Sequence, residues 1–174
     1  MFLVAGIFMA KILVITGSSR LYGNSYMLAE AFIKGVHRAN VHDVKIYNTL
    51  WRKMQNENEE DKDFSSLIKW ADTLVIITPL HWFSFSPQIK MLLDKICTLV
   101  KENSLSNIRE VFLIGYGDTK YQEAFNGLIE TYENIARYQN WKNKGCFVVP
   151  NVWKKGDVKK YKVLDTVENI GKEF

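Results

Sequence analysis

The fold is decided by the stretch Gly17-Ser18-Ser19-Arg20-Leu21-Tyr22-Gly23-Asn24-Ser25, which separates a short apolar run from an amphipathic pattern. The run before it, residues 11–16, is rich in β-branched residues, as expected of a parallel strand buried on both faces. After it, apolar residues recur at helical spacing over 27–36. Glycines let a backbone approach an anion, hydroxyl and amide groups donate to its oxygens, and a helix N-terminus offers unpaired N–H groups. The loop therefore predicts a phosphomonoester site, and the alternative is a turn that only caps its helix.

Three familiar phosphate loops do not match this stretch. A P-loop needs Gly-Lys-Ser/Thr at its end, and no lysine occurs between Lys11 and Lys34. The dinucleotide fingerprint needs three glycines in the first turn, and only Gly17 and Gly23 are present. A phosphotyrosine-phosphatase loop needs a cysteine nucleophile, which this stretch lacks. The permanent charge and forked donors of Arg20 nevertheless favour an anionic ligand.

Strand and helix patterns alternate along the rest of the chain. Strands are predicted at residues 11–16, 42–47, 73–78, 109–116 and 145–150, with helical patterns between them, clearest at 87–100. The alternation predicts an α/β fold: a flavodoxin-like, doubly wound five-stranded parallel sheet in the order 2-1-3-4-5, with helices on both faces. Ligands then bind at the carboxyl ends of strands 1 and 3. We expect residues 1–174 to form a single domain, with the polar segment 48–63 as a surface loop.

Composition narrows the function classes. The chain has 174 residues, 47% apolar, with a formal charge of +4, and its basic residues do not interleave with aromatics, so nucleic acid is not an expected partner. The basic stretch 154–162 is expected to open a surface helix. Cys97 and Cys146 lie far apart without a metal motif, so we expect two buried core thiols, no metal and a cytoplasmic location. Residues 1–10 are apolar but too short for a membrane span and lack the basic start of a signal peptide. They represent either a strand extension or a segment before an alternative start at Met9.

Two further loops should meet the first one at the sheet edge. The loop after strand 3, residues 78–87, is unusually aromatic and contains Trp82, Phe83 and Phe85. Aromatic residues near a phosphate site suggest a flat ring stacked on them, and a hydrophobic interface is the alternative. The loop after strand 4, residues 115–119, supplies a third wall, and either Asp118 or Thr119 is expected to cap the next helix, with Asp118 favoured. A phosphate site, a planar ring and a third polar wall together predict a mononucleotide with a large ring, such as FMN.

These loops resemble those of the flavodoxin-like NAD(P)H-dependent FMN reductases and quinone reductases, which include the iron-sulfur flavoproteins. The first loop is similar to the family's Gly-Ser-x-Arg-x-x-Gly-Asn-Ser/Thr phosphate loop, and residues 71–79 and 86–95 resemble its second signature. The resemblance implies that FMN is bound by three groups of residues. They are Ser18, Arg20, Gly23, Asn24 and Ser25 at the phosphate, Pro79, Leu80, His81, Trp82 and Phe83 along the isoalloxazine and ribityl chain, and Tyr116 and Gly117 opposite.

The resemblance also has departures. Iron-sulfur flavoproteins carry a compact cysteine cluster between strands 2 and 3, and residues 48–63 contain no cysteine, so no iron-sulfur cluster is predicted. His81 stands where the family often has tyrosine, and Phe83 stands where it often has a smaller residue.

The function implied by the resemblance is an FMN-dependent NAD(P)H oxidoreductase that passes hydride through bound flavin to a quinone, free flavin or similar aromatic acceptor. No catalytic residue is named, because the flavin carries the chemistry. The resemblance implies a homodimer or higher homo-oligomer, with Trp82, Phe83 and Phe85 as contact candidates, and no membrane partner. One alternative is a flavodoxin-type electron carrier without nicotinamide turnover, which the basic charge disfavours. Another is a flavin-free α/β binding module, although a receiver domain needs an aspartate where Thr78 stands.

Overall fold

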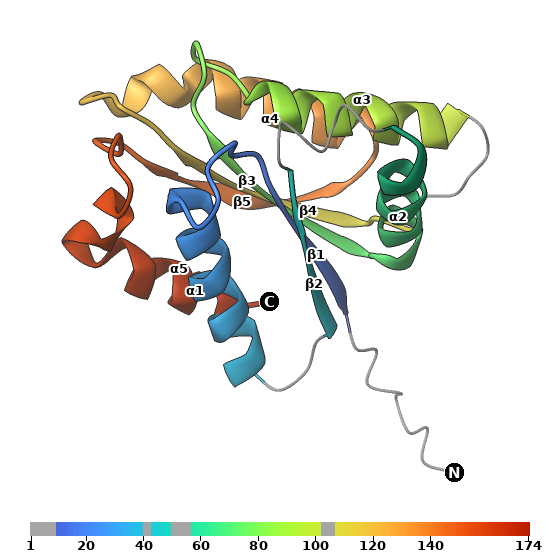
Figure 1. The fold of residues 1–174 in the computed structure, drawn as a ribbon, viewed down its shortest axis with the longest axis horizontal. Helices are drawn as coiled ribbons and strands as arrows, with labels where there is room; N and C mark the ends of the chain where they lie inside the picture. Colours follow the sequence, from blue (N-terminus) through green and yellow to red (C-terminus); the bar gives the residue numbers. More distant parts are fainter. Residues whose placement is uncertain (1–9, 40–42, 50–56, 102–106) are drawn as a thin grey trace.

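Five parallel strands form one sheet in the order β2-β1-β3-β4-β5, which confirms the predicted fold class and strand order (Figure 1). The computed structural model describes residues 10–39, 43–49, 57–101 and 107–174. The strands are β1 (Lys11–Thr16), β2 (Asp43–Asn48), β3 (Thr73–Pro79), β4 (Glu110–Tyr116) and β5 (Lys142–Val149). Because they are parallel, their carboxyl ends meet at one edge of the sheet, where ligands bind in such folds.

Helices cover both faces of the sheet because successive side chains of each strand point in opposite directions. Leu13 and Ile15 pack under α2 (Glu57–Trp70), α3 (Pro87–Lys101) and α4 (Asn126–Tyr138). Ile12 and Val14 pack under α1 (Asn24–Arg38) and α5 (Val163–Lys172). These four β1 side chains are at most 1% exposed. Full burial of one such side chain contributes about 1.5–3 kcal/mol, so the two cores fix the sheet and the loops at its end.

Helices α1 and α5 lie side by side with their backbones in contact (Figure 1). A Cβ atom on Gly35 would lie 2.0 Å from the carbonyl oxygen of Glu168, and one on Gly171 would lie 2.2 Å from that of Phe32. The nearly buried Glu168 carboxylate also forms ion pairs with Lys34, at 2.7 Å, and with Arg38. This packing brings the segment between β5 and α5 to the N-terminus of α1. The segment includes the short 3-10 helix η2 (Asp157–Lys162), at the position of the expected surface helix.

Two predicted boundaries were wrong. β5 begins at Lys142 rather than at residue 145, because an edge strand accommodates exposed polar residues, and Lys142 bonds to Glu110 of β4 at 3.0 Å. α2 begins at Glu57, so residues 57–63 are helical rather than part of a loop. Acidic residues suit a first helical turn, and the buried Phe64 and Ile68 anchor the helix. The other residues of that predicted loop at 50–56, the segment 1–9 and residue 42 lie outside the described residues.

The cysteines also differ from the expectation of buried core thiols. Cys146 is exposed and Cys97 is partly exposed. Cys146 lies on β5, which has a neighbouring strand on one side only, so the open edge leaves its thiol accessible to solvent.

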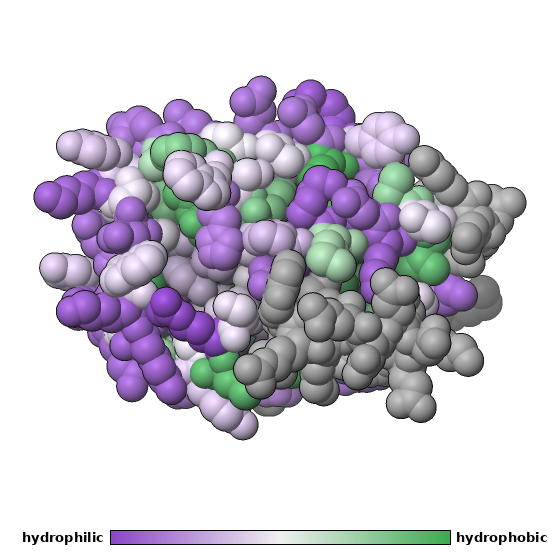
Figure 2. Space-filling model, turned by 45° about the horizontal axis from the view of Figure 1, so that its top comes forward, coloured by the Kyte–Doolittle hydropathy of each residue, from purple (hydrophilic) through white to green (hydrophobic). Residues whose placement is uncertain are grey.

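The surface carries dispersed charges. The face seen in Figure 2 is mostly hydrophilic, with apolar side chains in small groups between charged ones. Among the described residues, no helix has the length and apolar character needed to cross a membrane.

Candidate functional site

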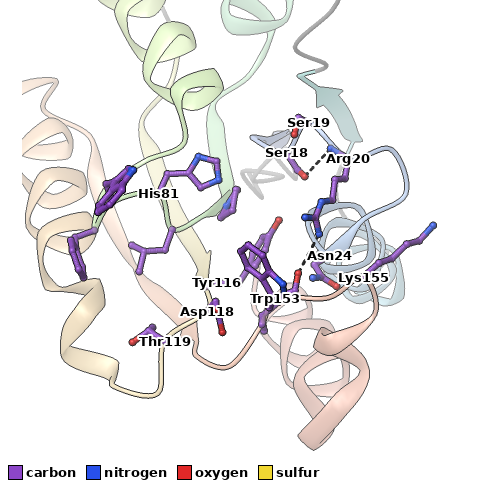
Figure 3. A pocket seen from close by; sticks show the side chains of 16 residues that line it. Ser18, Ser19, Arg20, Asn24, His81, Tyr116, Asp118, Thr119, Trp153 and Lys155 are labelled. Carbon is purple, nitrogen blue, oxygen red and sulfur yellow. Dashed lines mark hydrogen bonds between the residues drawn. The ribbon is translucent and has the colours of Figure 1, made fainter.

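The loops that follow β1, β3, β4 and β5 surround a cavity of about 600 Å³ at the carboxyl edge of the sheet (Figure 3). Small-molecule sites commonly have volumes of this order. The structure brings most of the predicted site residues to its wall: Ser18, Arg20, Asn24, Pro79, Leu80, His81, Trp82, Phe83, Tyr116 and Gly117. The other two, Gly23 and Ser25, are not in the wall. Gly23 is the N-cap of α1, and Ser25 lies in its first turn with 1% of its surface exposed.

The β1–α1 loop is held close to the start of α3. The Gly17 N–H donates to the carbonyl of Ile77 at 2.8 Å. A Cβ atom on Gly17 would lie 2.3 Å from Cγ1 of Ile89 and 2.4 Å from Oγ of Ser86, so a larger residue would displace the loop. At the other end of the loop, Gly23 caps α1 without a side-chain hydrogen bond. The first N–H groups of α1 therefore receive no hydrogen bond from a side chain at the N-cap position, and they lie beside the cavity.

Two side chains of the β1–α1 loop are tied to the β5–α5 segment. Asn24 donates through Nδ2 to the carbonyl of Lys154 at 2.9 Å, and its Oδ1 accepts from the N–H of Gly156 at 2.8 Å. Arg20 donates through Nη1 to the carbonyl of Trp153 at 3.2 Å, and its guanidinium carbon lies 5.9 Å from the centre of the Trp153 ring. The β5–α5 segment, the fourth loop at this edge of the sheet, is thus a wall of the site.

This fourth wall was not among the predicted features of the site. Val152, Trp153 and Lys155 line the cavity, as does Ser19 of the first loop (Figure 3). A usable signal existed, because an aromatic residue and a lysine directly follow the apolar run of the fifth strand, which ends at the same edge as the other strands.

The aromatic wall is built on a tight turn. His81 and Ser84 exchange two backbone hydrogen bonds, of 3.0 and 3.1 Å, and both residues between them have positive φ, 48° at Trp82 and 65° at Phe83. This is the geometry of a type I′ turn, which favours Asn and Gly. Left-handed backbone costs roughly 1–2 kcal/mol per ordinary residue, and little burial offsets it at Trp82, which is 95% exposed. Phe83 is 60% exposed, whereas Phe85 is buried at 6% in this chain's own core, which corrects its assignment as an intersubunit contact.

The β4 loop supplies Tyr116, whose side chain runs beneath the site toward α1. Its hydroxyl lies 2.7 Å from Oγ of Ser25, and its ring is 6% exposed. Burial raises the pKa of Tyr116 above its ordinary value, and hydrogen bonds from Ser25 and Ser18 and the charge of Arg20 oppose the shift only in part. The Tyr116 hydroxyl therefore stays protonated at neutral pH.

The expected helix cap at Asp118 was wrong. The N–H of Tyr121, next to the 3-10 helix η1 (Gln122–Phe125), donates to Oγ1 of Thr119 at 3.1 Å. This bond closes a short Ser/Thr turn between Thr119 and the residue two positions ahead. It does not cap the helix, because the N-cap residue of η1 is Tyr121, which makes no side-chain cap hydrogen bond. Asp118 instead lines the cavity.

The charge balance of the wall is positive. Among the described lining residues, Arg20 and Lys155 are cations and Asp118 is the acidic one. The protein around His81 partly desolvates its imidazole, which lowers its pKa below the ordinary value, so His81 is neutral at neutral pH. Within the ranges that the structure describes, no group of three or more His, Cys, Asp or Glu side chains could hold a metal ion. The cavity thus combines an electropositive end rich in donors with an aromatic end, and it can hold a ligand that has an anionic group and a flat ring.

Comparisons with known proteins agree with this architecture. A family model described as a flavodoxin-like fold matches residues 10–110. A Bacillus subtilis (strain 168) protein, provisionally named NAD(P)H-dependent FMN-containing oxidoreductase YwqN, is 22% identical over 161 residues, which cover 85% of this chain and 88% of that protein.

Two solved structures have a similar fold. One is the Trp repressor binding protein from Bacillus subtilis, with a TM-score of 0.68 and 19% identity over 90% of this chain and 95% of that one. The other is an NAD(P)H:quinone oxidoreductase from Methanothermobacter marburgensis, with a TM-score of 0.66 and 14% identity over 95% of this chain and 96% of that one.

Proposed function

We propose that this chain, which belongs to the family with a flavodoxin-like fold, is an FMN-dependent NAD(P)H oxidoreductase acting on a quinone, free flavin or similar aromatic acceptor. The observation that carries the proposal is the convergence of a donor-rich loop, a helix N-terminus and an aromatic turn on one cavity. The names of the YwqN protein and of the Methanothermobacter enzyme support it.

The residues of the cavity fit FMN in both size and chemistry. The anionic end of the nucleotide matches Ser18, Arg20 and the N-terminus of α1, where hydroxyl, guanidinium and backbone donors gather. The planar end matches the wall that Leu80 and Trp82 form on the opposite side. The volume of about 600 Å³ lies within the usual range for cofactor sites.

When bound, FMN supplies the ability to accept hydride from a nicotinamide and to pass electrons to a second acceptor. The chain's own residues bind and orient it. Arg20 is positioned by its bond to the Trp153 carbonyl, so its remaining guanidinium donors are pre-oriented toward the cavity. Neutral His81 carries one N–H donor and one nitrogen acceptor, and it can donate to a carbonyl oxygen of the ring.

The proposal is tested by binding and turnover together. Purified protein should bind FMN more tightly than riboflavin, because the phosphate end of the site is its electropositive end, and FMN-loaded protein should oxidise NADPH or NADH with quinone or free flavin. Arg20→Gln should weaken FMN binding roughly tenfold or more, because it removes a charged donor from an anion.

The matched control is Arg137→Gln on α4, where the guanidinium bonds to exposed Asn134. It should leave FMN binding unchanged. Absence of NAD(P)H oxidation with any acceptor would overturn the enzyme assignment, and flavin binding without such turnover would favour the electron carrier. The expected homodimer, with Trp82 and Phe83 as contacts, stays a prediction.

A further inference from the structure

The hydroxyl of Tyr116 lies at the phosphate end of the cavity rather than at the ring end. Tyr116 ends β4 and lines the cavity (Figure 3). Its hydroxyl lies 2.7 Å from Oγ of Ser25 in the first turn of α1. The resemblance had set Tyr116 opposite the ring. The reach of the side chain toward α1 follows from strand alternation, which gives Tyr116 the same face as Ile114 and Phe112 in the core under α1 and α5.

The hydroxyl groups around Tyr116 have more protons than they use. A hydroxyl carries one proton and two acceptor lone pairs, so Tyr116, Ser25 and Ser18 carry three protons, and the hydrogen bonds of Tyr116 with Ser25 and with Ser18 engage two of them. Within the part of the chain that the structure describes, neither the Tyr116 hydroxyl nor the Ser25 hydroxyl donates to a backbone carbonyl or to a carboxylate. Both groups are almost fully buried, with exposures of 6% for Tyr116 and 1% for Ser25. Because Ser25 and Ser18 both donate to the Tyr116 oxygen, the proton left over is that of Tyr116. A buried donor without an acceptor is costly, so this proton calls for an acceptor from the cavity.

The surroundings of this pair favour an anionic acceptor. Ser18 is a second hydroxyl neighbour of Tyr116, and Arg20 is the charged group that acts on it. The N-terminus of α1, which begins at Asn24, adds the positive end of a helix dipole. A cluster of donors in a positive field binds an oxyanion better than a neutral ligand.

We infer that Tyr116 is a phosphate-binding residue, whose hydroxyl donates a hydrogen bond to the phosphate of the bound mononucleotide while Ser25 holds it in place. The inference rests on the proposed function, since FMN provides the phosphate. The anion site is otherwise formed by the β1–α1 loop and α1. Tyr116 adds to it a hydrogen-bond donor from the end of β4. Tyr116 then contributes to the discrimination between FMN and riboflavin.

The test compares two flavins that differ in the phosphate alone. Tyr116→Phe removes the hydroxyl and keeps the ring, and dissociation constants for FMN and riboflavin are measured by flavin-fluorescence titration of the purified chain. We expect FMN affinity to fall roughly tenfold to a hundredfold, as for loss of a hydrogen bond to a charged group, and riboflavin affinity to stay unchanged. Ser25→Ala, which removes the partner hydroxyl, should weaken FMN binding in the same selective way, and the double variant should be less than additive.

The matched control is Tyr132→Phe. Tyr132 is also buried, and its hydroxyl donates to the carbonyl of Val111 at 2.8 Å and contacts Oδ1 of Asn143 at 2.7 Å, away from the cavity. This variant should lose stability without any change in FMN affinity.

Three results would overturn the inference. Equal weakening of FMN and riboflavin by Tyr116→Phe would mean that the residue only supports the packing of the site, and unchanged affinities would mean that the hydroxyl does not reach the phosphate. If Tyr116→Phe does not fold, as judged by circular dichroism, Ser25→Ala decides between the same outcomes. Failure of the unmodified chain to bind FMN at all would overturn the proposed function and this inference with it, which distinguishes the two failures.

Discussion

Replacement of Trp82 by asparagine should stabilise the protein in the absence of ligand. Trp82 has a φ of 48° in a turn that favours Asn, and relief of the left-handed strain is worth about 1 kcal/mol. Because Trp82 is 95% exposed, the indole buries about a twentieth of roughly 250 Å², which at about 25 cal/mol per Å² contributes about 0.3 kcal/mol. The free energy of unfolding should therefore rise by about 0.7 kcal/mol, which corresponds to an increase of about 1.5–3 °C in Tm for a chain of this length.

The assay is urea unfolding followed by far-UV circular dichroism, because tryptophan fluorescence changes with the substitution itself. The control is Tyr138→Asn at the end of α4, which is also largely exposed, at 79%, but has helical backbone. Its free energy of unfolding should barely change, since Tyr and Asn have similar helix propensities. A Trp82→Asn variant less stable than the unmodified chain would contradict this prediction, because the indole would then have to pack against protein, as it would in the expected homodimer contact. We further expect the stabilised variant to bind flavin more weakly, because backbone strain persists at functional sites where ligand binding needs the strained geometry.

Two further predictions concern the loops around the cavity. Gly17→Ala should lower the free energy of unfolding by about 1–3 kcal/mol and weaken FMN binding, because the new methyl group would lie 2.3 Å from Ile89; unchanged urea unfolding would contradict the close approach. Asp157 accepts hydrogen bonds from Lys160 and from the N–H of Trp153, which hold its pKa at about 2 in the folded protein, against an ordinary value of 3.8. Because the pKa of Asp157 is lower in the folded than in the unfolded protein, the ionised carboxylate stabilises the fold at pH values above 3.8. This stabilisation is lost as the pH falls from 3.8 through about 2. Asp157→Asn should therefore be less stable than the unmodified chain near neutral pH, in urea titrations repeated at falling pH, and the difference should shrink across that acid window; a difference independent of pH would contradict the assignment.

The sheet and most of the cavity wall could be predicted because their signals are local. Each strand is a short apolar run, and each predicted site loop follows such a run directly, as with Ser18 after β1 and Pro79 at the end of β3. The fourth wall depends on a contact between Arg20 and Trp153, which are 133 positions apart. That contact exists because the glycine packing of α1 on α5 brings the two segments together. The residues after the fifth strand were a local signal that this segment reaches the site edge, but no local pattern encodes its contact with Arg20.

Side-chain direction could also be predicted from the sequence. The period of two along β4 sets the Tyr116 side chain on the α1 face, whereas the position of Tyr116 relative to a flavin ring stays a prediction. The left-handed turn at Trp82 and Phe83 is different. Neither residue type favours positive φ, so local propensity argued against the geometry that the structure adopts. Such conflicts between local preference and fold are expected at functional sites.

The proposed function is tested most sharply by the visible absorbance of the FMN-loaded protein during anaerobic addition of NADPH and, separately, NADH. We expect that FMN binds and that its visible absorbance band bleaches with at least one of the two nicotinamides. A protein that binds no FMN, or whose bound flavin keeps its colour with both nicotinamides in excess, would contradict it.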